Sequence, residues 1–253
     1  FVHTFFTLVP PSVYFNDHPE WYSEIDGKRV PNQQLCTTNP EMRKVLLAAV
    51  RERLRANPKA TIISVSQNDT YGPCQCMVCK AIDDREGSYA GTMLELVNYV
   101  AANIKDEFPN VAVDTLAYQY TRAATKKLEP LPNVIVLLCS IECSFAQPLA
   151  DEANKTFGDD IRNWNQRSKR LYVWDYTTNF AHYLQPQPNW FNLGPNLRFF
   201  HMHGVKGMFE QGAYQSDGSE MTELRAWLLA QLMWNPYQDD KKLIDEFLVG
   251  YYG

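Results

Sequence analysis

Short apolar runs that end in polar or acidic residues recur along the chain and alternate with segments of helical period. Most of these runs are continuously apolar, which is typical of strands that are covered on both faces. Strands of that kind, separated by helices, indicate a parallel sheet with helices packed against it. The predicted strands are VHTFFTLVP, ATIISVSQND, VAVDTLAYQY, NVIVLLCSIEC, RLYVWDYTTNF and GVKGMFEQG.

The segments between the runs carry helix signals. Asn39 is a good N-cap, Pro40 suits the first helical position, and the apolar residues that follow fall on one face before the sequence ANP. From Ser88, apolar residues keep helical spacing as far as Pro109. The link TRAATKKLEPLP, between the third and fourth runs, is short and bounded by proline, which disfavours a full helix. Two further helices are predicted, around Met221–Met233 and Lys241–Tyr252.

No glycine-rich phosphate loop follows any predicted strand, and this favours a closed barrel over an open doubly wound sheet. We therefore predict an α/β fold of the (β/α)8 TIM type. The six predicted strands are two fewer than such a barrel needs, and the chain starts inside an apolar run. We expect the first two strands to precede Phe1. Because no linker or repeat divides the chain, residues 1–253 are expected to form one barrel domain that is incomplete at its N-terminus.

Composition and charge argue against two classes of partner. The formal net charge is -5 with a sequence pI of about 5.6, and the 24 lysines and arginines are scattered along the chain. Such a chain has no basic patch for a phosphate backbone, so we expect no nucleic-acid partner. No apolar run approaches the roughly 20 residues of a membrane-spanning helix, so we expect no membrane span in this chain.

Carboxylates and aromatic residues follow most of the predicted strands. In a barrel, the chemistry takes place at the carboxyl ends of the strands. Two carboxylates there can act as general acid and base across a glycosidic bond, and aromatic rings stack on sugars. A single acid could equally cap the next helix, but the same pattern at five strand ends favours a carbohydrate site. The residues concerned are Asp69, Tyr118, Tyr120, Glu142, Asp175, Tyr176 and Glu210, while Trp174 and Trp190 either line sugar subsites or belong to the core.

Several long strings resemble the barrel domain of glycoside hydrolase family 163. They are QNDTYGPCQCMVCKAIDDREGS, DTLAYQYTR, NVIVLLCSIECSFAQPL, WDYTTNFAHY and GVKGMFEQGAY, and the similarity extends from HTFFTLVPP to FLVGYYG. The resemblance implies an endo-β-N-acetylglucosaminidase that cleaves beside GlcNAc in complex N-glycans, with residues 1–253 as its catalytic TIM barrel. Proteins of this family usually also carry an N-terminal accessory domain and the first barrel strands.

The resemblance also implies where the enzyme works and on what. It indicates an exported protein, periplasmic or at the cell surface, in a bacterial glycan forager of the Bacteroidetes type. Its partner would be an oligosaccharide or the glycan of a glycoprotein, and no cofactor is expected.

A role for each candidate residue follows from the same resemblance. In β-hexosaminidase-like barrels, one member of an adjacent polar pair holds the 2-acetamido group of the substrate and the next protonates the leaving oxygen. The acetamido oxygen is then the nucleophile, and the mechanism retains configuration. Asn68 and Asp69 match that pair, and Glu142 is the competing general acid. The expected substrate-binding residues are Asp175 or Tyr176 for the oxazolinium-like intermediate, Glu210 for sugar hydroxyls, and Tyr118, Tyr120 and Trp174.

Three of the six cysteines crowd into one loop. Cys74, Cys76 and Cys79 could join Cys36 in a tetrahedral zinc site, although the usual pair of CxxC motifs is absent. Disulfides that fasten a long loop and reduced structural thiols are the alternatives, and the sequence leaves them open. We expect no metal, and we interpret the loop as scaffolding beside the active site.

Two other functions remain open from the sequence. A glycosidase of the α-glucuronidase type would need a basic residue for the uronate, and Arg122 is the candidate at the predicted rim. A glycan-binding barrel without catalytic activity would need the aromatic residues alone, and the acids at several strand ends argue against it.

Overall fold

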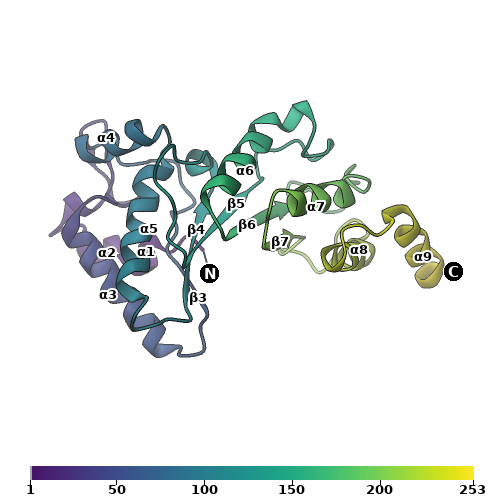
Figure 1. The fold of residues 1–253 in the computed structure, drawn as a ribbon, viewed down its shortest axis with the longest axis horizontal. Helices are drawn as coiled ribbons and strands as arrows, with labels where there is room; N and C mark the ends of the chain where they lie inside the picture. Colours follow the sequence, from purple (N-terminus) through teal and green to yellow (C-terminus); the bar gives the residue numbers. More distant parts are fainter. Residues whose placement is uncertain (1) are drawn as a thin grey trace. The chain divides into compact units, whose positions relative to one another are not determined.

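The computed structural model describes residues 2–253. It consists of two compact units, Phe1–Leu138 with Gln166–Arg170 and Cys139–Asn165 with Leu171–Gly253. Each unit contains parallel strands and helices, which Figure 1 labels. No helix among the described residues is long and apolar enough to cross a membrane. A single barrel domain over residues 1–253 stays a prediction.

Three parallel strands pair in the order of the sequence in the first unit. The register places Ile63 opposite Val113 and Thr115 opposite Val136. The strand within the fourth apolar run, Val134–Cys139, is buried along its whole length, which explains why it contains no alternating polar residues. Because the strands are parallel, their carboxyl ends lie at the same edge of the sheet. The strands are β3 (Ile62–Ser64), β4 (Ala112–Ala117) and β5 (Val134–Cys139).

The second unit has a parallel pair, β6 (Leu171–Tyr176) and β7 (Gly207–Gln211). Its register places Trp174 opposite Phe209 and Asp175 opposite Glu210. A helix, α7 (Leu193–Met202), lies between the two strands in the sequence, so their connection is a crossover.

Parallel strands that follow one another in sequence order, with crossovers between them, are typical of a (β/α) barrel. In a doubly wound sheet the order reverses at a switch point. The crossover from β3 to β4 includes α5 (Ala90–Ile104), which packs against β4. The predicted α/β fold is therefore confirmed as a partial TIM-like barrel, with five parallel strands among the described residues.

The first apolar run, VHTFFTLVP, is not a strand, so this prediction was wrong. It forms α1 (Phe5–Leu8) and leads into α2 (Pro11–Tyr14). The N–H groups of Thr4 and Phe5 both donate to the carbonyl of Ser66, at 3.1 and 3.2 Å, so the segment meets the chain after β3 at one point. Pro10, which ends the run, and Pro11, which follows it, have no N–H group and cannot build a ladder.

The helices expected from the sequence are all present. Asn39 accepts hydrogen bonds from the N–H groups of Glu41 and Met42, each at 3.0 Å, and so caps the first long helix as predicted. The expected helices are α3 (Pro40–Ala56), α5, α8 (Thr222–Trp234) and α9 (Asp240–Tyr252); α4 (Met77–Glu86), α6 (Lys155–Arg167) and α7 were not expected. Shorter elements are β1 (Glu24–Ile25), β2 (Lys28–Arg29) and the 3-10 turns η1 (Pro19–Trp21), η2 (Gln119–Thr121) and η3 (Glu152–Asn154).

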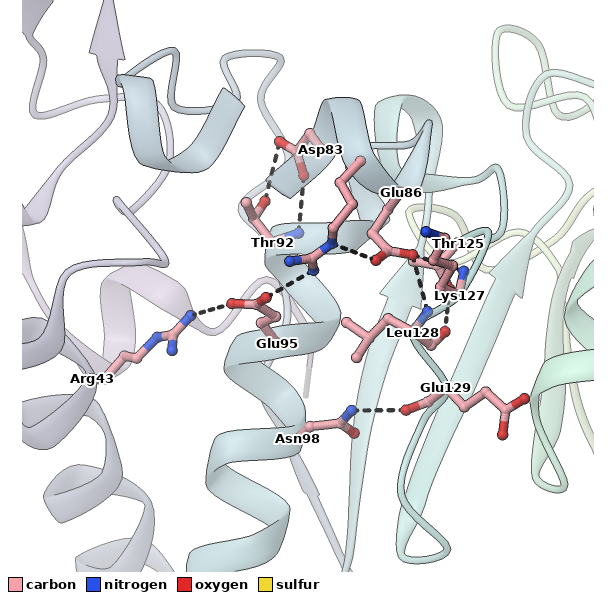
Figure 2. Close-up of polar contacts among 11 residues, drawn as sticks. Arg43, Asp83, Glu86, Thr92, Glu95, Asn98, Thr125, Lys127, Leu128 and Glu129 are labelled. Carbon is pink, nitrogen blue, oxygen red and sulfur yellow. Dashed lines mark hydrogen bonds and ion pairs between the residues drawn. The ribbon is translucent and has the colours of Figure 1, made fainter. Parts of the chain in front are cut away.

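The link between β4 and β5 contains no α-helix, as the sequence predicts. Side chains of the helices before it hold it in place, as Figure 2 shows. Glu86, at the end of α4, accepts hydrogen bonds from the N–H groups of Lys127 and Leu128 at 2.9 and 3.0 Å. Asn98 on α5 donates to the carbonyl of Glu129 at 2.8 Å. These bonds satisfy backbone groups that a crossover helix would have satisfied internally.

Candidate active site

In the first unit, Asp69 follows β3 and Tyr118 follows β4, so the parallel pairing brings both to the same edge of the sheet. The Tyr118 hydroxyl donates to Asp69 Oδ1 at 2.9 Å, and Gln119 Nε2 donates to that hydroxyl at 3.0 Å. Asp69 is exposed. Its carboxylate is therefore open to solvent and is held in position from the end of β4.

Gln119 has a φ of 50°, in the left-handed region that residues other than glycine rarely adopt. Thr121 holds this turn through its hydroxyl. Its Oγ1 accepts a hydrogen bond from the N–H of Tyr118 at 3.1 Å and donates one to Gln67 Oε1 at 2.6 Å. Backbone strain of this kind persists where surrounding bonds fix it, and it concentrates at functional sites. Gln119 is not among the site residues that the sequence predicts, because no residue pattern reveals a positive φ at that position.

Asn68 is the neighbour of Asp69, but it faces the interior and is 7% exposed. Its side-chain amide donates to the carbonyl of Gln33 at 2.9 Å and accepts from the N–H of Phe6 at 3.3 Å. Both polar atoms of this side chain are therefore bonded to backbone groups. Its predicted role as the acetamido-binding residue stays a prediction.

Tyr120 lines a hollow of about 850 Å³ in the first unit. Tyr71 and Tyr89 meet its ring edge-on, with centroid distances of 5.4 and 5.9 Å. Lys80 and Asp84 add charged groups to the lining region. Aromatic rings with a few polar groups around a hollow are a common arrangement for a small-molecule site.

In the second unit, Asp175 and Glu210 lie opposite each other near the carboxyl ends of β6 and β7. Asp175 is 4% exposed and accepts a hydrogen bond from Ser140 Oγ. Glu210 is half-buried, and its Oε2 atom is fully buried with no hydrogen-bond partner among residues 2–253. An ionised oxygen in such a place is unfavourable, which favours a proton on this carboxyl.

Electrostatics separate this pair from ordinary surface acids. Burial raises the pKa of Asp175 to about 6, and the hydrogen bond from Ser140 opposes that shift. Burial also raises the pKa of Glu210 well above its usual value, and the negative charge of Asp175 adds to the increase. The pair therefore keeps a proton closer to neutral pH than an exposed carboxylate does.

The aromatic residues of β6 lie on the other face of the strand, because side chains alternate. The rings of Trp174 and Tyr176 stack with centroids 6.2 Å apart, and Phe209 meets Trp174 edge-on at 5.0 Å. Trp174 Nε1 donates to Gln211 Oε1 at 2.8 Å. The carboxylate and the aromatic rings predicted for β6 are therefore presented on opposite faces.

The other two candidates of the second unit, Glu142 and Trp190, lie in different environments from each other. Glu142 is exposed in the turn that follows β5. Trp190 packs against the guanidinium of Arg225 at 3.9 Å and donates to Glu220 Oε1 at 3.0 Å. Arg225 in turn pairs with Glu220 at 2.6 Å. These contacts place Trp190 in a partly buried polar network of the unit.

Cysteines that are far apart in the sequence gather in the first unit. Cys36, Cys74, Cys76 and Cys79, here called the cysteine cluster, have their sulfur atoms within 4.8 Å of one another. All four are free thiols in the structure.

The family model described as "Domain of unknown function (DUF4838)" matches residues 1–253. No curated protein sequence is significantly similar to the chain. Among solved structures, a native Bacteroidetes-affiliated GH5 cellulase linked with a polysaccharide utilization locus is 10% identical, with a TM-score of 0.48 over 90% of this chain and 72% of that one. XEG5A, a GH5 xyloglucan-specific endo-β-1,4-glucanase from a metagenomic library, is 17% identical, with a TM-score of 0.41 over 84% of this chain and 67% of that one.

Proposed function

The chain belongs to the DUF4838 family over its whole length, and from that premise we propose that it is a glycoside hydrolase of the endo-β-N-acetylglucosaminidase kind. It would cleave beside GlcNAc in complex N-glycans, a substrate supported by the sequence strings that resemble glycoside hydrolase family 163. The observation that carries the proposal is the Asp69 carboxylate, exposed at the carboxyl end of β3 and held by the Tyr118 hydroxyl at 2.9 Å.

A single exposed carboxylate fits a substrate-assisted mechanism. The acetamido oxygen of the substrate attacks the anomeric carbon, so the protein supplies a proton for the leaving oxygen and no nucleophile. Asp69 gives up that proton as the glycosidic bond breaks. Its carboxylate then removes a proton from the water that opens the oxazolinium-like intermediate. Two displacements at the same carbon retain the configuration.

Some residues around Asp69 face the substrate, and others hold the backbone near Asp69 in position. Tyr118 and Gln119 place a hydroxyl and an amide beside the carboxylate, and we assign to them the orientation of the acetamido group. Asn68 would bind that group only by releasing Phe6 and Gln33, so we assign it a positioning role.

The tyrosine-lined hollow supports a glycan as the ligand. Tyr120 and Tyr89 offer ring surface to sugar faces, and Lys80 and Asp84 offer hydrogen bonds to hydroxyl groups. We further propose that the enzyme is exported and acts in the periplasm or at the cell surface of a bacterium, which rests on the sequence resemblance.

The test is to incubate the protein with a galactose-capped complex N-glycan and to identify the products by mass spectrometry. We expect a fragment with GlcNAc at a new reducing end, and its formation should be about 100-fold slower or more with the Asp69→Asn variant. Release of a uronic acid from a glucuronide would favour the α-glucuronidase alternative instead. Binding of the glycan without any cleavage would leave a glycan-binding barrel and overturn the proposal.

A further inference from the structure

The cysteine cluster brings together sulfur atoms from two distant parts of the chain. Cys36 follows the hairpin of β1 and β2, while Cys74, Cys76 and Cys79 lie at the start of α4. Three of the four are buried, with exposed fractions of 7% or less, and Cys76 is partly exposed. From this convergence we infer that the four cysteines bind one zinc ion.

The distances between the sulfur atoms support a tetrahedral metal site. Zinc holds thiolates at about 2.3 Å, which places the sulfurs of a regular tetrahedron about 3.8 Å apart. Cys36 Sγ lies 3.7 Å from Cys76 Sγ and 3.9 Å from Cys79 Sγ. A disulfide needs about 2.05 Å. The spacing therefore matches sulfurs that share a metal, and it does not match a covalent pair.

Hydrogen-bond donors surround the sulfurs as they do in structural metal centres. The N–H of Glu24 donates to Cys74 Sγ at 3.4 Å, and Arg29 Nη1 donates to the same atom at 3.6 Å. Thr38 Oγ1 lies 3.1 Å from Cys79 Sγ. Donors of this kind stabilise metal-bound thiolates, and the arginine offsets part of the negative charge of a four-thiolate zinc centre.

The ligand set selects the metal. A closed set of four cysteines is a common environment for structural zinc, and it leaves no coordination position for water or substrate. The sequence predicts no metal, because the usual pair of CxxC motifs is absent. One ligand, Cys36, comes from a different part of the chain, where no second cysteine accompanies it.

The zinc site would join the two segments that surround Asp69, residues 34–36 and residues 68–79. Gln34, two residues before Cys36, donates from Nε2 to the carbonyls of Asn68 and Thr70 at 3.0 and 2.7 Å. The N–H of Asn68 donates back to Gln34 Oε1 at 2.9 Å. We call these three bonds between Gln34 and the backbone of residues 68–70 the clamp. Zinc at the cysteine cluster fixes the chain segments on both sides of it, through Cys36 and through Cys74–Cys79. Its role is structural, and it does not depend on which reaction the rim performs.

The direct test is elemental analysis of the protein purified without chelators or added metal. We expect about one zinc per chain, and near-complete loss of zinc in the Cys76→Ser variant. Cys76 is the best position because it is the partly exposed member, so its substitution disturbs the core least. Cys143→Ser, outside the cluster, is the matched control and should keep its zinc.

A second measurement covers the case in which Cys76→Ser does not fold. A mercurial reagent added to the wild-type protein should release one zinc as the cluster thiols react, and the released ion is read with a metal indicator. Replacing zinc with cobalt should give the visible absorption of a tetrahedral thiolate complex. Protein that contains iron instead, or that contains no metal and forms disulfides among these cysteines by mass spectrometry, would overturn the inference.

Discussion

Asp69 and Asn68 are adjacent, yet their surroundings differ. Asp69 is exposed, whereas Asn68 is buried, with 7% of its surface exposed, and is bonded to backbone groups. The sequence indicates that polar residues end the strand, because a continuous apolar run stops there. It does not indicate which of the two faces the interior. That depends on hydrogen bonds of Asn68 to the backbone of Phe6 and Gln33, which are distant in the sequence and come close only in the folded structure. The chemistry of the candidate residues was therefore predictable, and their partners were not.

Replacing Asp69 with asparagine tests the general acid. If Asp69 protonates the leaving oxygen, Asp69→Asn should lower turnover of natural glycans by about 100-fold or more. Aryl glycosides with activated leaving groups need little protonation and should lose much less, as steady-state kinetics on both substrates will show. Asp17→Asn, at an exposed acid on the loop after α2, should leave both rates unchanged. Equal losses on both substrates would transfer the acid role to Glu142.

Asp175→Asn should change how folding stability depends on pH. The folded-state pKa of Asp175 is raised from 3.8 to about 6, so the native state binds more protons between these values. Its contribution to stability is full below about pH 4 and is lost as the pH rises through about 6. At pH 7.5, Asp175→Asn should therefore increase the free energy of unfolding by about 1 to 3 kcal/mol.

Urea unfolding at several pH values measures this effect. The gain should disappear towards pH 4, where Asp175 is itself neutral. Asp245→Asn, at an exposed carboxylate on α9, is the control and should stay within about 0.5 kcal/mol of wild type. A gain that is the same at pH 4 and pH 7.5 would show that the charge of Asp175 is not the cause.

At the scale of elements, local signals decided what could be predicted. Asn39 and Pro40 marked the start of α3, and apolar runs marked β3 to β7. The apolar run at the N-terminus has the pattern of a strand, but in the structure it forms α1. Its tertiary contact with Ser66 is not visible in the sequence. In α7, Pro195 looks like a helix breaker, but it lies in the first turn, where its missing N–H is not needed.

Glu86 should prove essential for the link between β4 and β5. It is 1% exposed, and although burial raises its pKa, the N–H groups of Leu128 and Lys127 lower it overall. Glu86→Ala leaves two N–H groups without their charged acceptor and should lower the free energy of unfolding by about 2 to 3 kcal/mol. Because the folded-state pKa is lowered, this stabilisation is present near neutral pH and is lost as the pH falls through that pKa.

Chemical denaturation and hydrogen exchange of residues 126–133 test the role of Glu86. Faster exchange in this segment should accompany the loss of stability. Glu129→Ala removes an exposed glutamate of the same link and should change stability by less than about 0.5 kcal/mol. Similar losses in the two variants would mean that the link depends on net charge and not on the hydrogen bonds of Glu86.

At the scale of the whole molecule, the proposed activity depends on a group that belongs to the substrate. Replacing the 2-acetamido group of the sugar with hydroxyl removes the nucleophile, so cleavage should nearly vanish. A thiazoline that mimics the cyclised intermediate should bind far more tightly than substrate, because the site is complementary to that geometry. Inhibition constants and cleavage rates test both expectations. A covalent glycosyl-enzyme trapped with a fluorinated substrate, together with weak thiazoline inhibition, would show that a carboxylate of the protein is the nucleophile.

The clamp formed by Gln34 has a thermodynamic consequence. Its amide holds the backbone on both sides of Asp69, so this segment loses its conformational freedom when the protein folds and not when a ligand arrives. A rim that is ordered in advance keeps more of its contact energy as affinity. Calorimetry of glycan binding should accordingly show the small heat-capacity change of a rigid site, without the large one that accompanies coupled folding.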